Sequence, residues 1–310
     1  MTQQPGCCVC GRPLAPPFHT INGRAYCDEH FAAVNRPNGG AWLAGLAQIA
    51  GVALVCGALA WLAGMLPPLH GAALVAVGVA VALLPSLLWL VFFYAQDRLE
   101  PEPKGNIALV FITALLLTDV VGVRLVRDWF RVGDWAPQST LTSLLASTLI
   151  VGFTYQAIAY LAVRATVYTT PEFDERMDGI VYGTVAGLGC ATLLNLRFIL
   201  ENGGVALGPG SIRVATTALA MASFSGLMGY FMAAAKFERR PAWWVALGVA
   251  LAAACNGLFS WLISEVSASG LGVAPWRSLL LGLGVALVVF AILIGLMRRV
   301  TTVKIGRIGI

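Results

Sequence analysis

Long apolar runs separated by short polar breaks fill the chain after residue 40. Each run is long enough for a helix of about 20 residues, the length that crosses the hydrocarbon core of a bilayer. The runs predict eight spans, near residues 41–66, 72–94, 106–126, 139–163, 179–200, 212–235, 241–264 and 277–297. The predicted fold class is therefore an all-α polytopic membrane protein, in which residues 41–297 form a helical bundle.

The composition favours the same class. Of the 310 residues, 58% are hydrophobic and 11% are charged, whereas a soluble domain averages roughly 25% charged residues. The surplus of apolar side chains has no soluble core to enter, so membrane lipid is a predicted partner. The net charge is +5, but in a membrane protein the placement of the basic residues matters more than their sum. We therefore predict no nucleic-acid partner.

The lysines and arginines are unequally divided between the two sides of the predicted bundle. Fourteen of the twenty lie on the side that holds both termini, and four lie on the other side. Because cytoplasmic loops carry the excess of basic residues, both termini are predicted to be cytoplasmic. The first forty residues are polar and carry cysteines, a pattern that predicts no secretory signal.

Residues 1–34 predict a small metal-binding module ahead of the bundle. Cys7 and Cys10 form a C-x2-C pair, Cys27 and His30 form a C-x2-H pair, and sixteen residues separate Cys10 from Cys27. Two close pairs joined by one loop supply the four ligands of a tetrahedral structural zinc site. A unit of about thirty residues is too small to hold a core without such a metal. We therefore predict one structural zinc ion per chain.

Two alternatives for these ligands stay open. Cys8 could replace Cys7, and His19 could replace His30, although a C-x-C pair fits a metal knuckle poorly. The NGR sequence at residues 22–24 predicts a hairpin turn between two short strands. The module resembles the second half of a LIM domain, or a related treble-clef finger, and a Pro/Gly linker over residues 35–40 follows it. At the other terminus, residues 298–310 predict a basic cytosolic tail that could contact anionic lipid or simply fray.

The stretch from Pro171 to Asn195 combines a charged loop with a glycine-rich apolar helix. Gly179, Gly183 and Gly187 recur every four residues and predict a smooth stripe on one helix face. Inside a membrane such a stripe lets a neighbouring helix approach closely. The same helix carries Asn195 and Arg197 into the membrane, where polar groups usually face a cavity or a partner.

Three stretches carry more distinctive motifs. Residues 93–103 read FYAQDRLEPEP, residues 173–183 read FDERMDGIVYG, and residues 223–237 read SFSGLMGYFMAAAKF. Together they resemble the PrsW family of polytopic intramembrane proteases, over about residues 80–265. The resemblance implies a multi-pass protein of the bacterial inner (plasma) membrane. It also implies site-one cleavage of membrane proteins such as anti-sigma factors.

The chain departs from that family at the positions that carry chemistry. The family has an E-E-x-x-K motif, a glutamate before the asparagine of the next span, and two histidines in later spans. Paired carboxylates one helical step apart can hold a metal or activate water. The corresponding positions here hold Gln156, Ala157, Tyr160, Leu194, Met221 and Ala252. The resemblance therefore predicts no catalytic residues in this chain.

The favoured prediction is a pseudoprotease that binds membrane segments of other proteins and docks a cytosolic partner through its finger. One alternative is an active protease with a rearranged site. Another is a transporter or channel for small solutes. We expect Asp119 to pair with Arg197 or Arg213, because charges inside a membrane are normally paired. The candidate cavity residues are Asp119, Asp178, Asn195, Arg197 and Asn256.

Overall fold

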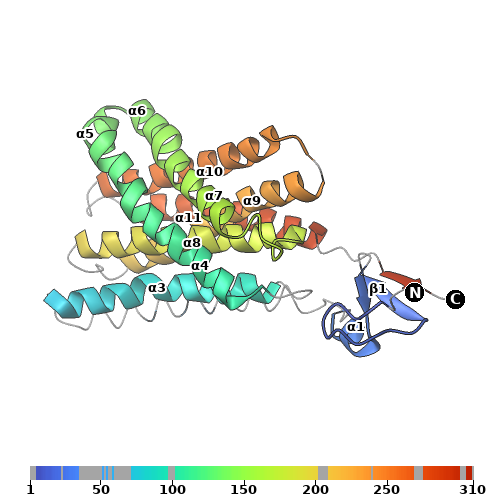
Figure 1. Cartoon of the computed structure of the whole chain (residues 1–310). Coiled ribbons are helices and arrows are strands. Elements are labelled where there is room, and N and C mark those ends of the chain that lie inside the picture. Colours follow the sequence, from blue (N-terminus) through green and yellow to red (C-terminus); the bar gives the residue numbers. More distant parts are fainter. Residues whose placement is uncertain are drawn as a thin grey trace.

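A computed structural model describes residues 5–21, 24–34, 71–96, 102–201, 209–238, 240–268, 275–300 and 305–308, with isolated positions at 51, 54 and 58. A small N-terminal finger lies beside one end of a helical bundle (Figure 1). We call that end of the bundle the finger end and the opposite one the far end. The predicted first span at 41–66 and the linker at 35–40 lie outside the continuous described segments.

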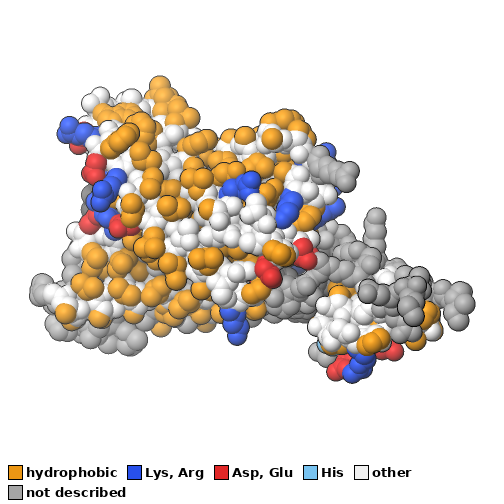
Figure 2. All heavy atoms as spheres, in the orientation of Figure 1, with side chains coloured by type: hydrophobic (Ala, Val, Ile, Leu, Met, Phe, Trp, Pro, Cys, Tyr) orange, Lys and Arg blue, Asp and Glu red, His pale blue; other side chains and the backbone are white. Residues whose placement is uncertain are grey.

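The bundle contains seven helical segments, in the described residues, that are long and apolar enough to cross a membrane. Each overlaps one of the predicted spans, so the all-α polytopic fold is confirmed. The long helices are α3 (Gly71–Gln96), α4 (Lys104–Leu117), α7 (Phe153–Thr166), α8 (Arg176–Glu201), α9 (Pro209–Phe237), α10 (Trp243–Ala268) and α11 (Pro275–Val300). Orange apolar side chains cover much of the visible bundle surface in Figure 2, as a lipid-facing surface requires.

The third span is longer than predicted and is irregular at the far end. There α4 continues into two π-helical segments, η1 (Thr118–Val123) and η2 (Leu125–Trp129). The chain then turns through the short elements α5 (Val132–Trp135), η3 (Ala136–Gln138) and α6 (Thr140–Leu145). A third π-helical segment, η4 (Ala146–Gly152), leads into α7. Segments of this kind often occur beside functional sites.

The centre of the bundle is the antiparallel pair α8 and α9. A Cβ on Gly179, Gly183 or Gly187 would overlap a backbone carbonyl oxygen of α9. These oxygens belong to Gly229, Ser225 and Met221. The predicted glycine stripe is therefore confirmed as the surface on which the two helices touch.

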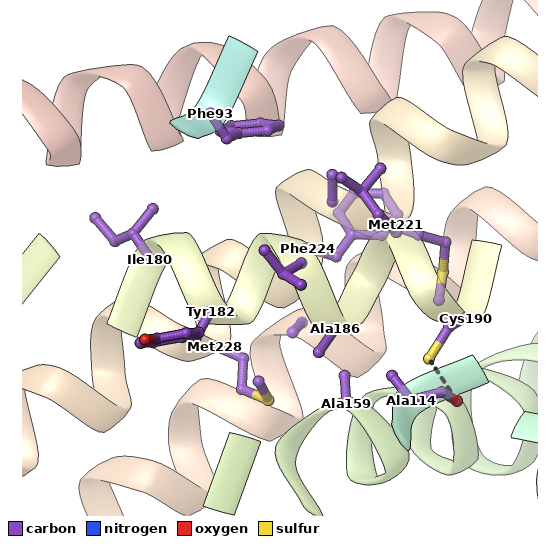
Figure 3. Close-up of a cluster of buried hydrophobic side chains, with 14 of the residues drawn as sticks. Phe93, Ala114, Ala159, Ile180, Tyr182, Ala186, Cys190, Met221, Phe224 and Met228 are labelled. Atoms are coloured by element: carbon purple, nitrogen blue, oxygen red, sulfur yellow. Dashed lines mark hydrogen bonds between the residues drawn. The ribbon is translucent and has the colours of Figure 1, made fainter. Parts of the chain in front are cut away.

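Large side chains fill the remaining space around this pair. Figure 3 shows Met221 and Phe224 of α9 near small residues of α8, such as Ala186. The aromatic rings of Trp89, Phe92 and Phe93 on α3 pack against Phe290 of α11, with centroid distances of 5.6, 5.5 and 6.1 Å. Edge-on and tilted contacts between rings at such distances are favourable. The core thus joins early and late spans.

The finger is a hairpin followed by a short helix. Strands β1 (Phe18–Ile21) and β2 (Arg24–Tyr26) pair antiparallel, and α1 (Asp28–Val34) follows. The pairing of Ile21 with Arg24 confirms the predicted hairpin, whose turn residues 22–23 lie outside the described part of the chain.

The C-terminal segment differs from the predicted tail. α11 runs to Val300, and β3 (Ile305–Ile308) adds to the hairpin as a third antiparallel strand, in the order β2-β1-β3. The sequence did not reveal this pairing, because a four-residue strand is stabilised by a partner strand far away in the chain.

Candidate functional sites

The finger brings its four predicted ligands together. One ligand atom from each of Cys7, Cys10, Cys27 and His30 lies within 4.8 Å of every other one. The Nδ1 atom of His30 is 3.0 Å from Cys27 Sγ and 3.8 Å from Cys7 Sγ. Three sulfurs and one imidazole nitrogen are a usual ligand set for tetrahedral zinc. This group could hold a metal ion.

Local backbone structure explains the position of the first pair. The amide of Gly11 donates to the carbonyl of Cys7, and the amide of Cys7 donates to the carbonyl of Arg12, both at 2.8 Å. Gly11 has a φ of 70°, which a residue with a Cβ adopts at a cost. A tight turn therefore follows Cys10.

The two alternative ligands lie outside the group. Cys8 is exposed, and the ring of His19 stacks on Phe31 with a centroid distance of 3.9 Å. The geometry therefore favours Cys7 over Cys8 and His30 over His19.

The electrostatics of the finger favour a thiolate at Cys7. Burial alone would raise the pKa of Cys7, but hydrogen bonds from backbone amides, including those of Cys27 and Cys10, lower it to about 6. The backbone amide of His30 lowers the pKa of Cys27, yet burial and the neighbouring Cys7 raise it above its usual value overall. Two thiols in contact cannot both ionise easily, and a cation between them would relieve this repulsion.

A pocket lies at the far end of the bundle. Its volume is about 340 Å³. We call it the arginine pocket, because three arginines line it. Its lining residues are Val123, Val126, Arg127, Val151, Tyr155, Leu194, Asn195, Arg197, Phe198, Glu201, Arg213, Thr217, Met221, Asn256, Phe259, Ser260, Ile263 and Ser264. Five predicted cavity or family positions therefore meet here: Leu194, Asn195, Arg197, Met221 and Asn256.

Two ion pairs hold charges of the arginine pocket in place. Asp119 accepts hydrogen bonds from Nε and Nη2 of Arg197, at 3.2 and 2.6 Å. Glu201 accepts from Arg127 at 2.6 Å. The predicted pairing of Asp119 with an arginine of the membrane region is confirmed. The Arg197 and Asp119 side chains are 36% and 45% exposed, so this pair is half-buried and not deep in the core.

Only two of the family positions line this pocket. Leu194 and Met221 line it, whereas Gln156, Ala157, Tyr160 and Ala252 do not. Gln156 is fully buried, and its Oε1 accepts from Ser225, one turn from Met221 on α9. Ala252 is also fully buried.

Two buried amides of this region have nitrogens without a hydrogen-bond partner. They are Nε2 of Gln156 and Nδ2 of Asn256, on side chains that are 0% and 2% exposed as residues. The oxygen of Asn256 is satisfied by Ser260 at 3.4 Å. Asn195, in contrast, donates to the carbonyl of Val214 at 2.9 Å, so it links α8 to α9. A buried donor with no acceptor is unfavourable and is a recognised sign of a binding position.

Asp178 lies elsewhere, at the finger end, and not in the arginine pocket. It is buried at the start of α8, where it accepts hydrogen bonds from the backbone amides of Asp174 and Glu175, at 2.7 and 2.6 Å. Nearby, the hydroxyl of Tyr182 donates to the carboxylate of buried Glu102. The motif at residues 93–103 therefore meets the motif at residues 173–183. The contact between Glu102 and Tyr182 links the segment before α4 to the first part of α8.

Sequence reasoning missed several of these features. It did not foresee that Arg127 would bind Glu201. It also missed the Glu102–Tyr182 contact, because 80 residues separate the partners. The presence of both residues in the distinctive motifs was the available signal.

Comparisons with known proteins agree with this arrangement. Residues 102–298 match the sequence model described as "PrsW family intramembrane metalloprotease". The Protease PrsW of Geobacillus kaustophilus is 30% identical over 194 residues, which cover 61% of this chain and 79% of the relative. That of Bacillus subtilis is 24% identical over 198 residues, covering 63% and 84%. No solved structure matches significantly. Since the match covers most of the bundle, with its packed motifs and its helices, the chain belongs to the PrsW family of intramembrane metalloproteases.

Proposed function

We propose that this chain is a non-hydrolytic member of its family, which binds membrane segments of other proteins without cleaving them. The main support is the replacement of the family's carboxylates and histidines by Gln156, Leu194, Met221 and Ala252. Gln156, Met221 and Ala252 are almost completely buried. The packing framework is therefore kept while the groups that activate water are replaced.

The family description implies a catalytic metal, and the donor set in the membrane does not fit one. Metals of hydrolytic sites are bound by histidine, carboxylate or thiolate groups. The family positions offer an amide, a thioether and alkyl groups instead. Among the described residues, the finger holds the one group of histidine, cysteine and acidic side chains at metal-binding spacing.

The replacements convert an acceptor-rich site into one that donates hydrogen bonds. A carboxylate binds cations and accepts protons, whereas the amide of Gln156 presents a buried N–H group without a partner. A carbonyl oxygen of a bound segment would satisfy such a donor, whose unpaired state costs about 1–3 kcal/mol. This supports recognition of a peptide backbone without attack on it.

A cleavage assay beside an active relative tests the proposal. The reconstituted protein is incubated with a single-span membrane protein that the Geobacillus kaustophilus protease cleaves under the same conditions. We expect stable co-purification of the intact substrate and no products. A matched variant carries Q156E, A157E, Y160K, L194E, M221H and A252H, to test whether the framework supports cleavage once the family groups return. Cleavage by the unmodified protein would refute the proposal.

We further propose that the finger binds one zinc ion and docks a cytosolic partner, with both termini in the cytoplasm and the bundle in the inner (plasma) membrane. Four protein ligands would close the zinc coordination, so the ion would be structural. The uneven distribution of basic residues supports the orientation. Metal analysis of the purified protein should give one zinc per chain. Labelling of exposed Cys8 from the cytoplasmic side only would support the orientation, and labelling from outside would overturn it.

A further inference from the structure

We propose that β3 is a metal-dependent latch, which pairs with the finger only while the finger holds its metal and then ties the finger to the last membrane helix, α11. The latch rests on the proposed zinc site of the finger, and it does not depend on whether the bundle cleaves peptides. Three features of the structure support it: the register of the sheet, the burial of β1, and the core that β1 shares with two of the predicted ligands.

The register of the hairpin determines which backbone groups of β1 face β3. Thr20 lies opposite Ala25 of β2, and the carbonyl of Ala25 accepts a hydrogen bond from the amide of Cys8, outside the hairpin. Residues of an antiparallel pair alternate between hydrogen bonding to the partner strand and facing away from it. The backbone groups of Thr20 therefore point away from β2 and toward β3, where Gly306 lies opposite.

Phe18 repeats this arrangement at the start of β1. It lies two residues before Thr20, so its backbone groups also point to β3, and its partner there is Ile308. Phe18 and Thr20 are each 8% exposed. Buried N–H and C=O groups need hydrogen-bond partners, and β3, the red strand in Figure 1, runs along this edge of the hairpin. Loss of β3 would therefore leave β1 with unpaired backbone groups on one side.

The edge depends on the metal because β1 shares its core with the predicted ligands. Phe18 packs in one small cluster with Leu14, Cys7 and Cys27, and the two cysteines belong to the ligand group. A unit of about thirty residues needs a metal or another cross-link to hold its fold, and modules of this kind unfold when the metal leaves. Without the ion, the hairpin would lose its strands and β3 would lose its partner.

β3 is too short to be stable without β1. It has four residues, Ile305–Ile308, with a glycine at its second position. In the described sheet it pairs with β1 and lies at the edge. Short strands depend on their neighbours for stability, and a glycine inside a strand weakens it. Formation of β3 therefore requires the folded finger.

A short connection ties the latch to the membrane bundle. α11 ends at Val300 and β3 begins at Ile305. Five residue steps of extended chain span at most about 18 Å, so a paired β3 keeps the finger close to the end of α11. Release of β3 would remove this tie. The metal state of the finger would thus decide whether the finger is held at the end of the last span.

Metal binding and β3 pairing strengthen each other in this arrangement. Both need the same folded hairpin, and a coupling between two binding events is reciprocal. Metal loading should therefore favour the pairing of β3. A variant whose β3 cannot pair should bind the metal less tightly, by the same factor.

The zinc affinity of full-length variants tests the latch. The protein in detergent is loaded with zinc and titrated with a chromogenic zinc chelator. G306P removes the amide that faces Thr20 and interrupts the ladder between β1 and β3. We expect its zinc affinity to fall about tenfold, because the loss of one or two backbone hydrogen bonds changes an equilibrium constant by about this factor.

I305P is the matched control, one residue away in the same strand. Ile305 lies opposite Ile21, whose backbone groups face β2, so the amide of Ile305 points away from β1. Proline is tolerated at the first residue of a strand and where the missing amide faces outward. I305P should therefore bind zinc as tightly as the unmodified protein.

Hydrogen–deuterium exchange of residues 301–310 gives a second readout. With zinc bound, the amides of Gly306 and Ile308 should exchange slowly, and removal of the zinc should make both exchange fast. In G306P the amide of Ile308 should exchange fast even with zinc bound. Equal zinc affinity of G306P and the unmodified protein, or slow exchange of β3 that persists after the zinc is removed, would overturn the latch alone. Failure of the unmodified protein to bind zinc would overturn the proposed zinc site, and the latch with it.

Discussion

The finger and the membrane bundle both contain sequence motifs that predict a chemical site. The finger keeps the residues that such a site needs, whereas the bundle keeps only the residues that pack its helices. In the finger, four ligands predicted from spacing meet within 4.8 Å. In the bundle, the framework motifs pack together, with the glycine stripe against α9 and Tyr182 against Glu102. The family positions for chemistry nevertheless hold Gln156 and apolar residues.

This difference shows that framework and chemistry can be separated within one chain. Glycines at a helix contact cannot change, because any side chain would collide with the backbone of the partner. A catalytic carboxylate can be replaced by an amide or an alkyl group of similar size, and the fold survives. Sequence similarity to PrsW proteases over the bundle is therefore direct support for a shared fold and only indirect support for a shared activity. In the finger the four predicted ligands would themselves form the framework once they bind a metal, so framework and chemistry would not separate there.

The largest effect should follow from loss of a finger ligand. C10S removes one of four ligands, and the finger should lose its metal and unfold, because metal binding supplies most of the folding free energy of such a module. Metal analysis should fall from one ion to none, and limited proteolysis should cut residues 5–34. The thermal unfolding of the bundle should stay nearly unchanged. C8S is the control, because Cys8 lies outside the ligand group; equal metal loss in both variants would contradict the assignment.

The next largest effect should come from a methyl group at the centre of the bundle. A Cβ at Gly229 would overlap the carbonyl oxygen of Gly179, so G229A must push α8 and α9 apart. We expect a loss of about 1–3 kcal/mol or more in the free energy of unfolding, as overpacking in cores gives. Thermal unfolding in detergent measures it. The matched control is G284A, where a Cβ meets nothing within 4 Å; similar stability of the two variants would argue against this contact.

The finger and the bundle also show which features could be predicted from the sequence. The seven described spans, the hairpin, the four ligands and the glycine stripe follow from local patterns of hydrophobicity and spacing. The cavity was predicted in part, since Asn195, Arg197 and Asn256 line the arginine pocket. The Arg127–Glu201 pair could not be predicted, because its partners are 74 residues apart and belong to different spans. The pairing of β3 with β1 was missed for the same reason, because it joins residues almost 290 positions apart and leaves no local pattern.

A smaller effect should follow from breaking the contact between the two motifs. Y182F removes the hydroxyl that donates to buried Glu102. A typical hydrogen bond inside a protein stabilises it by about 0.5–1.5 kcal/mol, and thermal unfolding should report the loss of this one. Y94F is the matched control, and it should lower stability less than Y182F. The Tyr94 hydroxyl donates to the backbone carbonyl of Glu102 over a longer distance of 3.3 Å, so the hydrogen bond that is lost is weaker. If Y182F were as stable as the unmodified protein, the motifs would have a role other than holding the framework.

The smallest effect should come from the Asp119–Arg197 pair, even though it lies in a membrane bundle. Both side chains are about one-third to one-half exposed, and ion pairs with such access to solvent stabilise proteins by about 0–1 kcal/mol. D119N should therefore lower the free energy of unfolding by less than about 1 kcal/mol, and high salt should reduce the difference further. D134N, which breaks the exposed Arg131–Asp134 pair, should give a similar value. A loss of about 3–5 kcal/mol in D119N alone would instead mark a desolvated pair that holds α8 against η1, and it would make this charge part of the framework.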